Sequence, residues 1–296
     1  MEMKFRAHDT FFIRKGWISK GMRYVDKNPE VFISKKENPM DILGIGANMV
    51  KALRYWLQAI GVTEEPTSGR RIQEFTPFGK LVFKHDPYIE ELGTLYLLHY
   101  KLASNVELAT SWYYFFNEFA LSDFTKDDFV AQIANFIKMK DKDANVAPRS
   151  IEDDFSCIIN TYVPRYKAMP GKVSAENNID CPLGELGLID ILKKERNNVV
   201  YKKSIPTAST FNPWIVLAVI HANANGRKEI GLNELLTNPC NIGKIFNLDS
   251  IAMLDVLHSA ESTGELKIVR TAGLDVINLS NVHTFEKCVE YYYQDI

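Results

Sequence analysis

The chain has 296 residues, a length that allows one to three domains. With 46% hydrophobic and 24% charged residues, the composition is that of a soluble globular protein and excludes a disordered or fibrous chain. The 35 basic and 37 acidic residues give a net charge of −2, which by itself indicates no class of partner.

Cysteine spacing and hydropathy predict the compartment. The four cysteines, Cys157, Cys181, Cys240 and Cys288, form no CxxC pair, which argues against a zinc ribbon or a disulfide framework and fits reduced thiols. The first 20 residues carry charges throughout, and the apolar run over 214–222 is far too short to cross a bilayer. We therefore expect a cytoplasmic protein.

Charge is distributed unevenly along the chain. Residues 1–84 contain 15 Lys and Arg against 9 Asp and Glu, whereas the remainder contains 20 against 28. This asymmetry predicts that the N-terminal part faces a polyanion, although a solvated surface produces the same counts in some proteins.

The N-terminal elements predict a winged helix-turn-helix. Apolar residues at helical spacing indicate a helix over 10–26, and Asn38-Pro39 begins a second, short helix. A longer helix over 47–60 follows, and strands over 62–65 and 72–76 then flank a turn. A short helix, a turn and a longer helix are typical of a helix-turn-helix, and the hairpin supplies the wing.

The polar side of this unit carries residue types that contact DNA. We expect the longer helix and the wing to expose side chains that reach the phosphates and base edges of double-stranded DNA, namely Asn48, Lys51, Arg54, Tyr55, Arg70 and Arg71. The same pattern also fits a solvated helix face, or a winged helix that binds protein.

The remaining periodicity predicts a mainly α protein with small β wings. Central helices are expected over 88–102, 106–119, 126–139 and 150–162. Later helices and a hairpin are expected over 214–223, 232–236, 250–263 and 266–279, in the order of a second winged-helix-like unit. This unit exposes few basic residues, so a packing or partner-binding role is expected there. The predicted parts are a winged-helix domain over 1–84, a helical domain over 85–165, a connector over 166–212 and a winged-helix-like C-terminal domain over 213–296.

Acidic residues are the candidates for chemistry on a phosphodiester. No P-loop, GxGxxG, HExxH, GxSxG or EF-hand loop is present, which excludes the common nucleotide-binding and hydrolase motifs. Phosphodiester cleavage usually requires carboxylates that hold a divalent cation, here Mg²⁺ or Mn²⁺. Asp153 and Asp154 are the metal candidates, and capping of a helix that begins near Ser150 is the alternative. Asp180 and Glu185, after the aperiodic stretch that leads to Cys181, are the catalytic candidates.

A His-Asp pair near the N-terminus gives a second catalytic hypothesis. His8 and Asp9 directly precede the first predicted helix. Such a pair can act in general acid-base catalysis, or it can cap the helix and make a structural hydrogen bond.

The opening segment also matches a longer motif. FRAHDTFFIRKGWISKG fits F-x-x-H-[ED]-T-F-x-x-R-x-x-W-x-x-K-G at Phe5, His8, Asp9, Thr10, Phe11, Arg14, Trp17, Lys20 and Gly21. Similar blocks follow in order: LGIGANMVKALRYWL from Leu43, HDPYIEELGTLYLLHYKLAS from His85, SWYYFFNEF from Ser111, TYVP from Thr161 and DCPLGELGLI from Asp180. On these blocks the chain resembles the SspB-type family (domain of unknown function 4007) of bacterial DNA phosphorothioation systems.

The resemblance implies a role in anti-phage defence. Members of the family are encoded beside a cysteine desulfurase, an ATP pyrophosphatase and an ATPase, and are described as nickases, that is, endonucleases that cut one DNA strand. It therefore implies a nickase that acts with these sulfur-transfer partners. A non-catalytic DNA-binding adaptor and a transcriptional regulator are the alternatives, and the regulator lacks an evident heptad seam for dimerisation.

Overall fold

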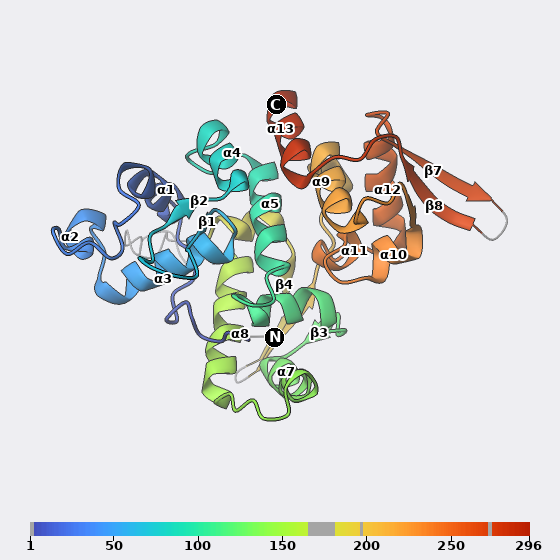
Figure 1. The fold of residues 1–296 in the computed structure, drawn as a ribbon. Helices are drawn as coiled ribbons and strands as arrows, with labels where there is room; N and C mark the ends of the chain where they lie inside the picture. The colour runs from blue at the N-terminus through green and yellow to red at the C-terminus, as the bar shows by residue number, and fades with distance from the viewer. Residues whose placement is uncertain (1–2, 165–180, 196–197, 272–273) are drawn as a thin grey trace, which may run out of the picture.

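The structure of the protein is a computed structural model that describes residues 3–164, 181–195, 198–271 and 274–296. Helices dominate the described part, and the strands form small antiparallel sheets. In Figure 1, helix α5 runs through the middle of the molecule, with α1–α4 on one side and α9–α12 on the other. This architecture confirms a mainly α protein with small β elements. Within the described residues, no helix combines the length and apolarity needed to cross a bilayer.

Three helices open the chain. They are α1 (Trp17–Lys27), α2 (Pro39–Leu43) and α3 (Ala47–Ala59). The prediction of a helix over 10–26 is wrong at its start, because Asp9, Thr10 and Gly16 all have positive φ, which an α-helix does not allow. The short helix after Asn38 is confirmed, and the Asn38 side chain accepts a hydrogen bond from the Met40 N–H.

A short hairpin and an unexpected helix follow α3. Strands β1 (Thr63–Glu64) and β2 (Glu74–Phe75) pair antiparallel, inside the two predicted strand ranges. Helix α4 (Pro77–His85) then begins, and the Thr76 side chain caps it by accepting from the Gly79 N–H. A Cβ at Gly79 would lie 1.9 Å from the Val62 carbonyl oxygen, so α4 packs directly on the backbone next to β1. The sequence prediction missed this helix.

The central helices surround α5. They are α5 (Leu92–Ala103), α6 (Thr110–Tyr113), α7 (Lys126–Lys140) and α8 (Pro148–Tyr162), and α6 continues as the short π-helix η1 (Tyr114–Glu118). Thr125 and Asp128 form the capping box of α7. Helix α8 begins at Pro148, so Ser150 is not its N-cap and the acidic residues Asp153 and Asp154 do not cap its first turn. The capping interpretation of these two residues is wrong.

The described part of 166–212, predicted as a connector, contains paired strands. The 3-10 turn η3 (Pro182–Leu186) leads into β4 (Ile189–Lys194), and β5 (Val199–Lys203) pairs with both β4 and β3 (Asp123–Phe124). The sheet order is β3-β5-β4. A second 3-10 turn, η4 (Ala208–Thr210), precedes the last part of the chain.

The last part combines helices with a hairpin. Its elements are α9 (Pro213–Ala224), β6 (Glu229–Gly231), α10 (Leu232–Thr237), α11 (Ile242–Ile245), α12 (Ser250–Glu261), β7 (Leu266–Thr271), β8 (Leu274–Leu279) and α13 (Phe285–Asp295). The sheet order is β6-β8-β7, and the β7–β8 hairpin projects away from the helices in Figure 1. Asp249 caps α12 as expected, whereas α11 and α13 were not predicted.

Helix α13 joins parts that are far apart in sequence. It packs on both α4 and α9. The Thr94 and Tyr293 hydroxyls lie 2.8 Å apart in a buried hydrogen bond, and a Cβ at Gly93 would lie 2.3 Å from the Tyr292 ring. One connected hydrophobic core runs from Trp56 near the N-terminus to α13.

Candidate functional site

Helix α3 and the hairpin carry the residues that were predicted to contact DNA, and the prediction for one of them, Tyr55, is wrong. Asn48 and Lys51 are exposed as expected. Tyr55 is buried, because it faces the 106–112 segment, and its hydroxyl donates to the Leu108 carbonyl at 2.9 Å. Burial, reinforced by the Asp154 carboxylate, raises the pKa of Tyr55. Tyr55 therefore presents no group to a base.

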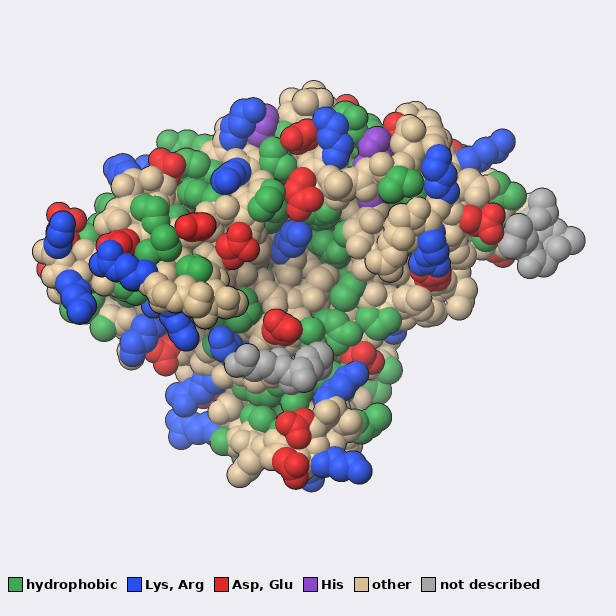
Figure 2. Space-filling model, in the orientation of Figure 1, with side chains coloured by type: hydrophobic (Ala, Val, Ile, Leu, Met, Phe, Trp, Pro, Cys, Tyr) green, Lys and Arg blue, Asp and Glu red, His purple; other side chains and the backbone are tan. Residues whose placement is uncertain are grey.

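Two of the predicted arginines make contacts within the protein. Arg54 Nε lies 2.5 Å from Glu65 Oε1, and its guanidinium also donates to the Arg71 carbonyl at 3.3 Å. Arg70 forms an ion pair with Glu30 on the surface. Lys51 and Arg71 are exposed, and within the described part of the chain neither side chain has an ion-pair partner. Figure 2 shows Lys and Arg side chains at the end formed by α2 and α3, with acidic side chains between them.

His8 forms a buried pair with Asp154, not with Asp9. His8 Nε2 lies 2.8 Å from Asp154 Oδ1, and the two residues are 1% and 2% exposed. The Thr10 N–H donates to His8 Nδ1 at 3.1 Å, which places the ring proton on Nε2. Asp154 also accepts from the Arg6 N–H at 2.8 Å and from Ser111 Oγ at 2.6 Å.

This arrangement holds the N-terminal segment against α8 and α6. The ring of His8 also stacks on Trp56, with 5.9 Å between the ring centroids. Asp153 lies on the same helix and forms an ion pair with Arg6 at 2.9 Å. Both carboxylates are therefore engaged by groups of the protein. Among the described residues, no three His, Cys, Asp or Glu side chains are grouped so that they could hold a metal ion.

Packing explains many residues of the opening block (residues 5–21). Trp17 is buried, and Lys20 Nζ donates to the Leu43 carbonyl at the end of α2 at 3.0 Å. A Cβ at Gly21 would lie 2.8 Å from Leu57, so glycine allows α1 to approach α3 closely. Arg14 differs, because its guanidinium lies over the Phe11 and Trp17 rings and has no ion-pair partner in the described chain.

In the blocks that begin at His85 and Asp180, packing and hydrogen bonds likewise explain some residues and leave others unexplained. The Asp86 carboxylate accepts from the N–H groups of Glu90 and Glu91 at 2.9 and 3.1 Å, and so fixes the turn before α5. Leu183, Leu186 and Leu188 are buried. The side chains of Tyr88, Glu90 and Glu185 are exposed, and within the described chain they make no hydrogen bond or ion pair.

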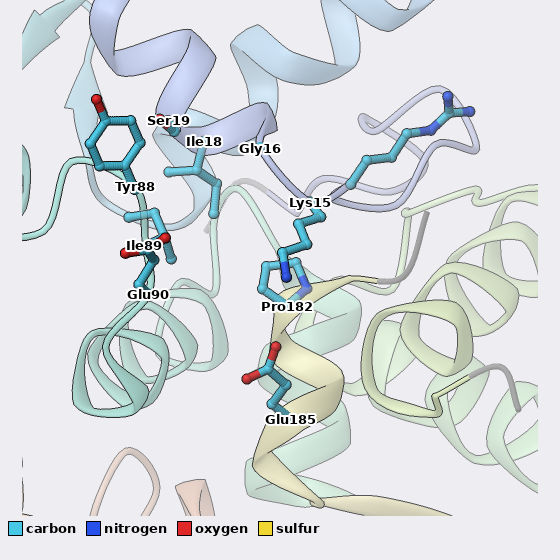
Figure 3. Close-up of a pocket in the computed structure, with 10 residues that line it drawn as sticks. Lys15, Gly16, Ile18, Ser19, Tyr88, Ile89, Glu90, Pro182 and Glu185 are labelled. Carbon is cyan, nitrogen blue, oxygen red and sulfur yellow. The ribbon is translucent and has the colours of Figure 1, made fainter. Parts of the chain in front are cut away.

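These side chains surround one cavity of about 350 Å³, which we call the Glu185 cavity (Figure 3). Its lining comes from the opening block (Arg14, Lys15, Gly16, Ile18, Ser19), from the segment before α5 (Tyr88, Ile89, Glu90) and from η3 (Pro182, Glu185). In Figure 3, Tyr88 and Glu90 lie on one side, and Lys15 and Glu185 on the other. The cavity thus brings cations and carboxylates from three separate blocks together.

A comparison with models of known families shows to which family the chain belongs. The model described as "Protein of unknown function (DUF4007)" matches residues 5–293. The chain belongs to the DUF4007 family.

Solved structures resemble this DUF4007 protein along nearly its whole length. An SspB crystal structure shares 26% sequence identity with a TM-score of 0.84, and a magnesium ion-bound SspB crystal structure shares 27% with a TM-score of 0.83. Each comparison covers 99% of this chain and 88% of the other. A comparison with curated protein sequences gave no match.

The structure places the predicted site residues of this DUF4007 protein in different environments. Glu185 lines the cavity, and His8, Asp153 and Asp154 are held by other groups of the protein. Asp180 lies outside the described residues. The prediction did not include the other charged and aromatic lining residues, which are Arg14, Lys15, Tyr88 and Glu90. The sequence blocks that carry the resemblance contain charged and aromatic residues that packing does not require. These residues were the signal that could have identified the lining of the cavity.

Proposed function

We propose that the protein nicks double-stranded DNA as a component of a bacterial DNA phosphorothioation system. The observation that carries this proposal is the convergence of Lys15, Arg14, Glu90 and Glu185 from three blocks of the sequence on one cavity. The likeness to the SspB structures supports the assignment to such a system.

The cavity offers the groups that phosphodiester hydrolysis requires. Lys15 and Arg14 would hold the non-bridging phosphate oxygens, because cations form charge-assisted hydrogen bonds with them. Glu90 or Glu185 would accept the proton of the attacking water, whose oxygen bonds to phosphorus as one P–O ester bond breaks. The departing sugar oxygen takes up a proton from solvent and becomes a strand-terminal hydroxyl.

The two carboxylates of this cavity suit a divalent cation that is also bound by a substrate phosphate. Mg²⁺ keeps several waters and is usually bound through one or two carboxylates together with substrate phosphates. Glu90 and Glu185 could supply those carboxylates, since both are exposed and neither has an ion-pair partner within the described chain. When bound, Mg²⁺ or Mn²⁺ supplies a Lewis acid for the phosphate oxygens.

Duplex DNA would be held outside the cavity by α3 and the wing. Asn48, Lys51, Arg70 and Arg71 are exposed there. Arg70 is paired with Glu30, and Arg54 connects α3 to the hairpin. The helix order and the hairpin support a winged helix in this region. Since its proposed substrate is bacterial DNA, the protein would act in the cytoplasm.

The last part of the chain would serve partner proteins. The order α9, β6, α10, α12, β7, β8 and the sheet order β6-β8-β7 support a second winged-helix-like unit. The exposed residues of α12 include Asp255 and His258, and no Lys or Arg lies on this helix. Such a surface suits protein better than DNA, and the sulfur-transfer proteins (cysteine desulfurase, ATP pyrophosphatase and ATPase) are the proposed partners.

A non-catalytic DNA-binding adaptor is the second candidate. The absence of a three-ligand metal group among the described residues favours it. An adaptor would bind DNA through the same α3 surface and would recruit the partners without cutting. A transcriptional regulator has no comparable support.

A plasmid relaxation assay separates the two candidates. The purified protein with Mg²⁺ or Mn²⁺ should convert supercoiled plasmid to the open circle, and EDTA should prevent this. Glu185→Gln and Glu90→Gln should each lower the nicking rate by about 100-fold or more, with DNA affinity retained. Glu107→Gln, at an exposed glutamate that does not line the cavity, is the matched control. A wild-type protein that binds the plasmid and leaves it supercoiled would favour the adaptor.

A further inference from the structure

We propose that the Glu185 cavity holds a single nucleotide taken out of the base stack, with its base against the Tyr88 ring. This inference rests on the proposed function and specifies the form of DNA that the site accepts. It is carried by the size of the cavity, by the exposure of Tyr88 and by the distribution of charge around the lining.

The size of the cavity excludes a base pair within a duplex. At about 350 Å³ it lies near the lower end of the range for small-molecule sites, roughly 300–1,000 Å³. A site of this volume suits one nucleotide. Proteins that take up a base in a pocket extrude its nucleotide from the duplex or act on single strands.

Tyr88 supplies a surface on which an extruded base can stack. It is 61% exposed and is the one aromatic residue among the exposed large hydrophobic residues of the described chain. Its ring stacks on no other ring of the described chain, whereas most aromatic residues here pack in the core. An aromatic ring held in water at the edge of a charged cavity is typical of a stacking platform for single-stranded nucleic acid.

Hydrogen bonds fix the backbone turn that carries Tyr88. Asp86 is buried and accepts from the N–H groups of Glu90 and Glu91, and the Ile89 N–H donates to the Asp86 carbonyl at 3.2 Å. Ile89 adopts φ 57°, which is unusual for a β-branched residue, and its side chain packs against the core. The turn that carries Tyr88 is therefore formed before the ligand arrives, which lowers the entropy cost of binding.

Charge around the cavity matches the two ends of a nucleotide. Lys15 and Arg14 suit the phosphate. Glu90, on the Tyr88 side of the cavity (Figure 3), can accept hydrogen bonds from the exocyclic amino group of a stacked base, as carboxylates do when they contact cytosine. Neither end would be satisfied by a purely apolar ligand.

The test compares a fully paired duplex with the same duplex carrying one unpaired nucleotide. Binding of both is measured without divalent metal, so that cutting does not interfere. The wild-type protein should bind the duplex with the unpaired nucleotide about tenfold more tightly, because the cost of extrusion is already met. Tyr88→Ala should remove this preference and Tyr88→Phe should retain it. Ile251→Ala, at an exposed residue of α12, is the control that should also retain it.

A fluorescent base reports the extrusion directly. A 2-aminopurine placed at the unpaired position should change its emission on binding wild-type protein and Tyr88→Phe, and less with Tyr88→Ala. Equal affinity of the wild-type protein for both duplexes, or a preference that survives in Tyr88→Ala, would overturn the inference. Failure of the proposed nicking gives a different result, in which the plasmid stays supercoiled while the preference for the unpaired nucleotide persists.

Discussion

His8 and Asp154 show how a pair of residues that suits catalysis can instead be structural. Both are buried, and the Asp154 carboxylate accepts three hydrogen bonds, from Arg6, His8 and Ser111. Ser111 contacts the aspartate and not the histidine, so the order of contacts is not that of a nucleophile activated by a base. The pair connects the N-terminal segment to α8.

We expect Asp154→Asn to destabilise the protein by about 3 kcal/mol, because buried donors lose a charged acceptor. Urea unfolding followed by circular dichroism measures this change. Asp153→Asn is the control on the same helix: its ion pair with Arg6 is partly exposed, so its loss should cost about 1 kcal/mol, less than the loss of the buried Asp154 carboxylate. Nicking that disappears in Asp154→Asn while stability is unchanged would contradict the structural role.

His99 predicts how stability depends on pH. Its Nε2 lies 2.8 Å from the Ile245 carbonyl, and its Nδ1 lies 2.8 Å from the Tyr162 hydroxyl, which can donate to a neutral ring. Burial lowers the pKa of His99 to about 4, whereas the unfolded chain has a value of about 6.5. The unfolded state therefore takes up the proton first, and the free energy of unfolding falls as the pH drops from 6.5 towards 4.

Between pH 7.5 and pH 5, His99 should lower the free energy of unfolding by about 2 kcal/mol. His99→Gln removes the titrating ring. Between pH 7.5 and pH 5, the free energy of unfolding of this variant should therefore fall by about 2 kcal/mol less than that of the wild-type protein. Urea titrations at both pH values measure the difference. The control is His258→Gln at an exposed position of α12, which should keep the wild-type pH dependence. An unchanged pH dependence in His99→Gln would show that His99 does not cause it.

Individual site residues were only partly predictable from the sequence. Glu185 was a candidate and lines the cavity, but Tyr88 and Glu90 are about a hundred residues away along the chain. Only the fold shows that these three residues line the same cavity. Likewise His8 finds its acidic partner 146 residues away, while its neighbour Asp9 turns elsewhere with φ 53°.

Among the elements, α3 and the hairpin expose part of the surface that was predicted to contact DNA. Lys51 and Arg71 are free to contact phosphates, whereas Arg54 is engaged by Glu65. Removing one cation that binds a phosphate should reduce the slope of log affinity against log salt by about 0.9. We expect Lys51→Ala and Arg71→Ala each to flatten the slope by about this amount, measured by fluorescence anisotropy on duplex DNA between about 50 and 200 mM salt.

Two further variants complete this measurement. Lys138→Ala removes an exposed cation of α7, away from α3, and should leave the slope unchanged. Arg54→Ala should act mainly by loosening the contact between α3 and the hairpin. Slopes that are unchanged in both Lys51→Ala and Arg71→Ala would remove this surface from the DNA interface.

Local signals decided which elements could be predicted. Helices α2, α7 and α12 have caps at Asn38, Thr125 and Asp249 that are visible in the sequence, and they were found close to their true limits. Helix α1 was predicted to begin too early, because its apolar periodicity continues into a segment where Gly16 takes a left-handed conformation. Helix α4 was missed because it begins directly after the hairpin, where Thr76 was assigned to a strand.

At the scale of the whole molecule, α13 joins the N-terminal and C-terminal parts of the chain. It contacts α4 from the N-terminal part and α9 from the C-terminal part, and Lys101 of α5 lies over the Phe285 ring with Nζ 3.9 Å from its centroid. No local signal predicted the packing of α13 on α4, because these two helices are separated by about two hundred residues. The predicted boundaries at 84/85 and 212/213 remain a prediction about how independently the parts fold.

Gly93 gives a direct way to weaken this junction. A Cβ there would lie 2.3 Å from Tyr292 of α13, in a helix whose packing leaves no space for it. We expect Gly93→Ala to lower the free energy of unfolding by about 1 to 3 kcal/mol through overpacking, even though alanine favours the helix itself. Gly231→Ala is the control, since a Cβ there meets nothing within 4 Å and should change stability by less than about 1 kcal/mol.

The shape of the unfolding transition then tests whether the junction makes the protein one cooperative unit. Since one core extends across the junction, wild-type protein should unfold in a single calorimetric transition. Gly93→Ala should lower its midpoint, and if α13 is the main connection the transition should broaden or split as the two sides separate. An unchanged midpoint, or two transitions already present in the wild-type protein, would mean that α13 does not couple the ends and that the parts fold independently.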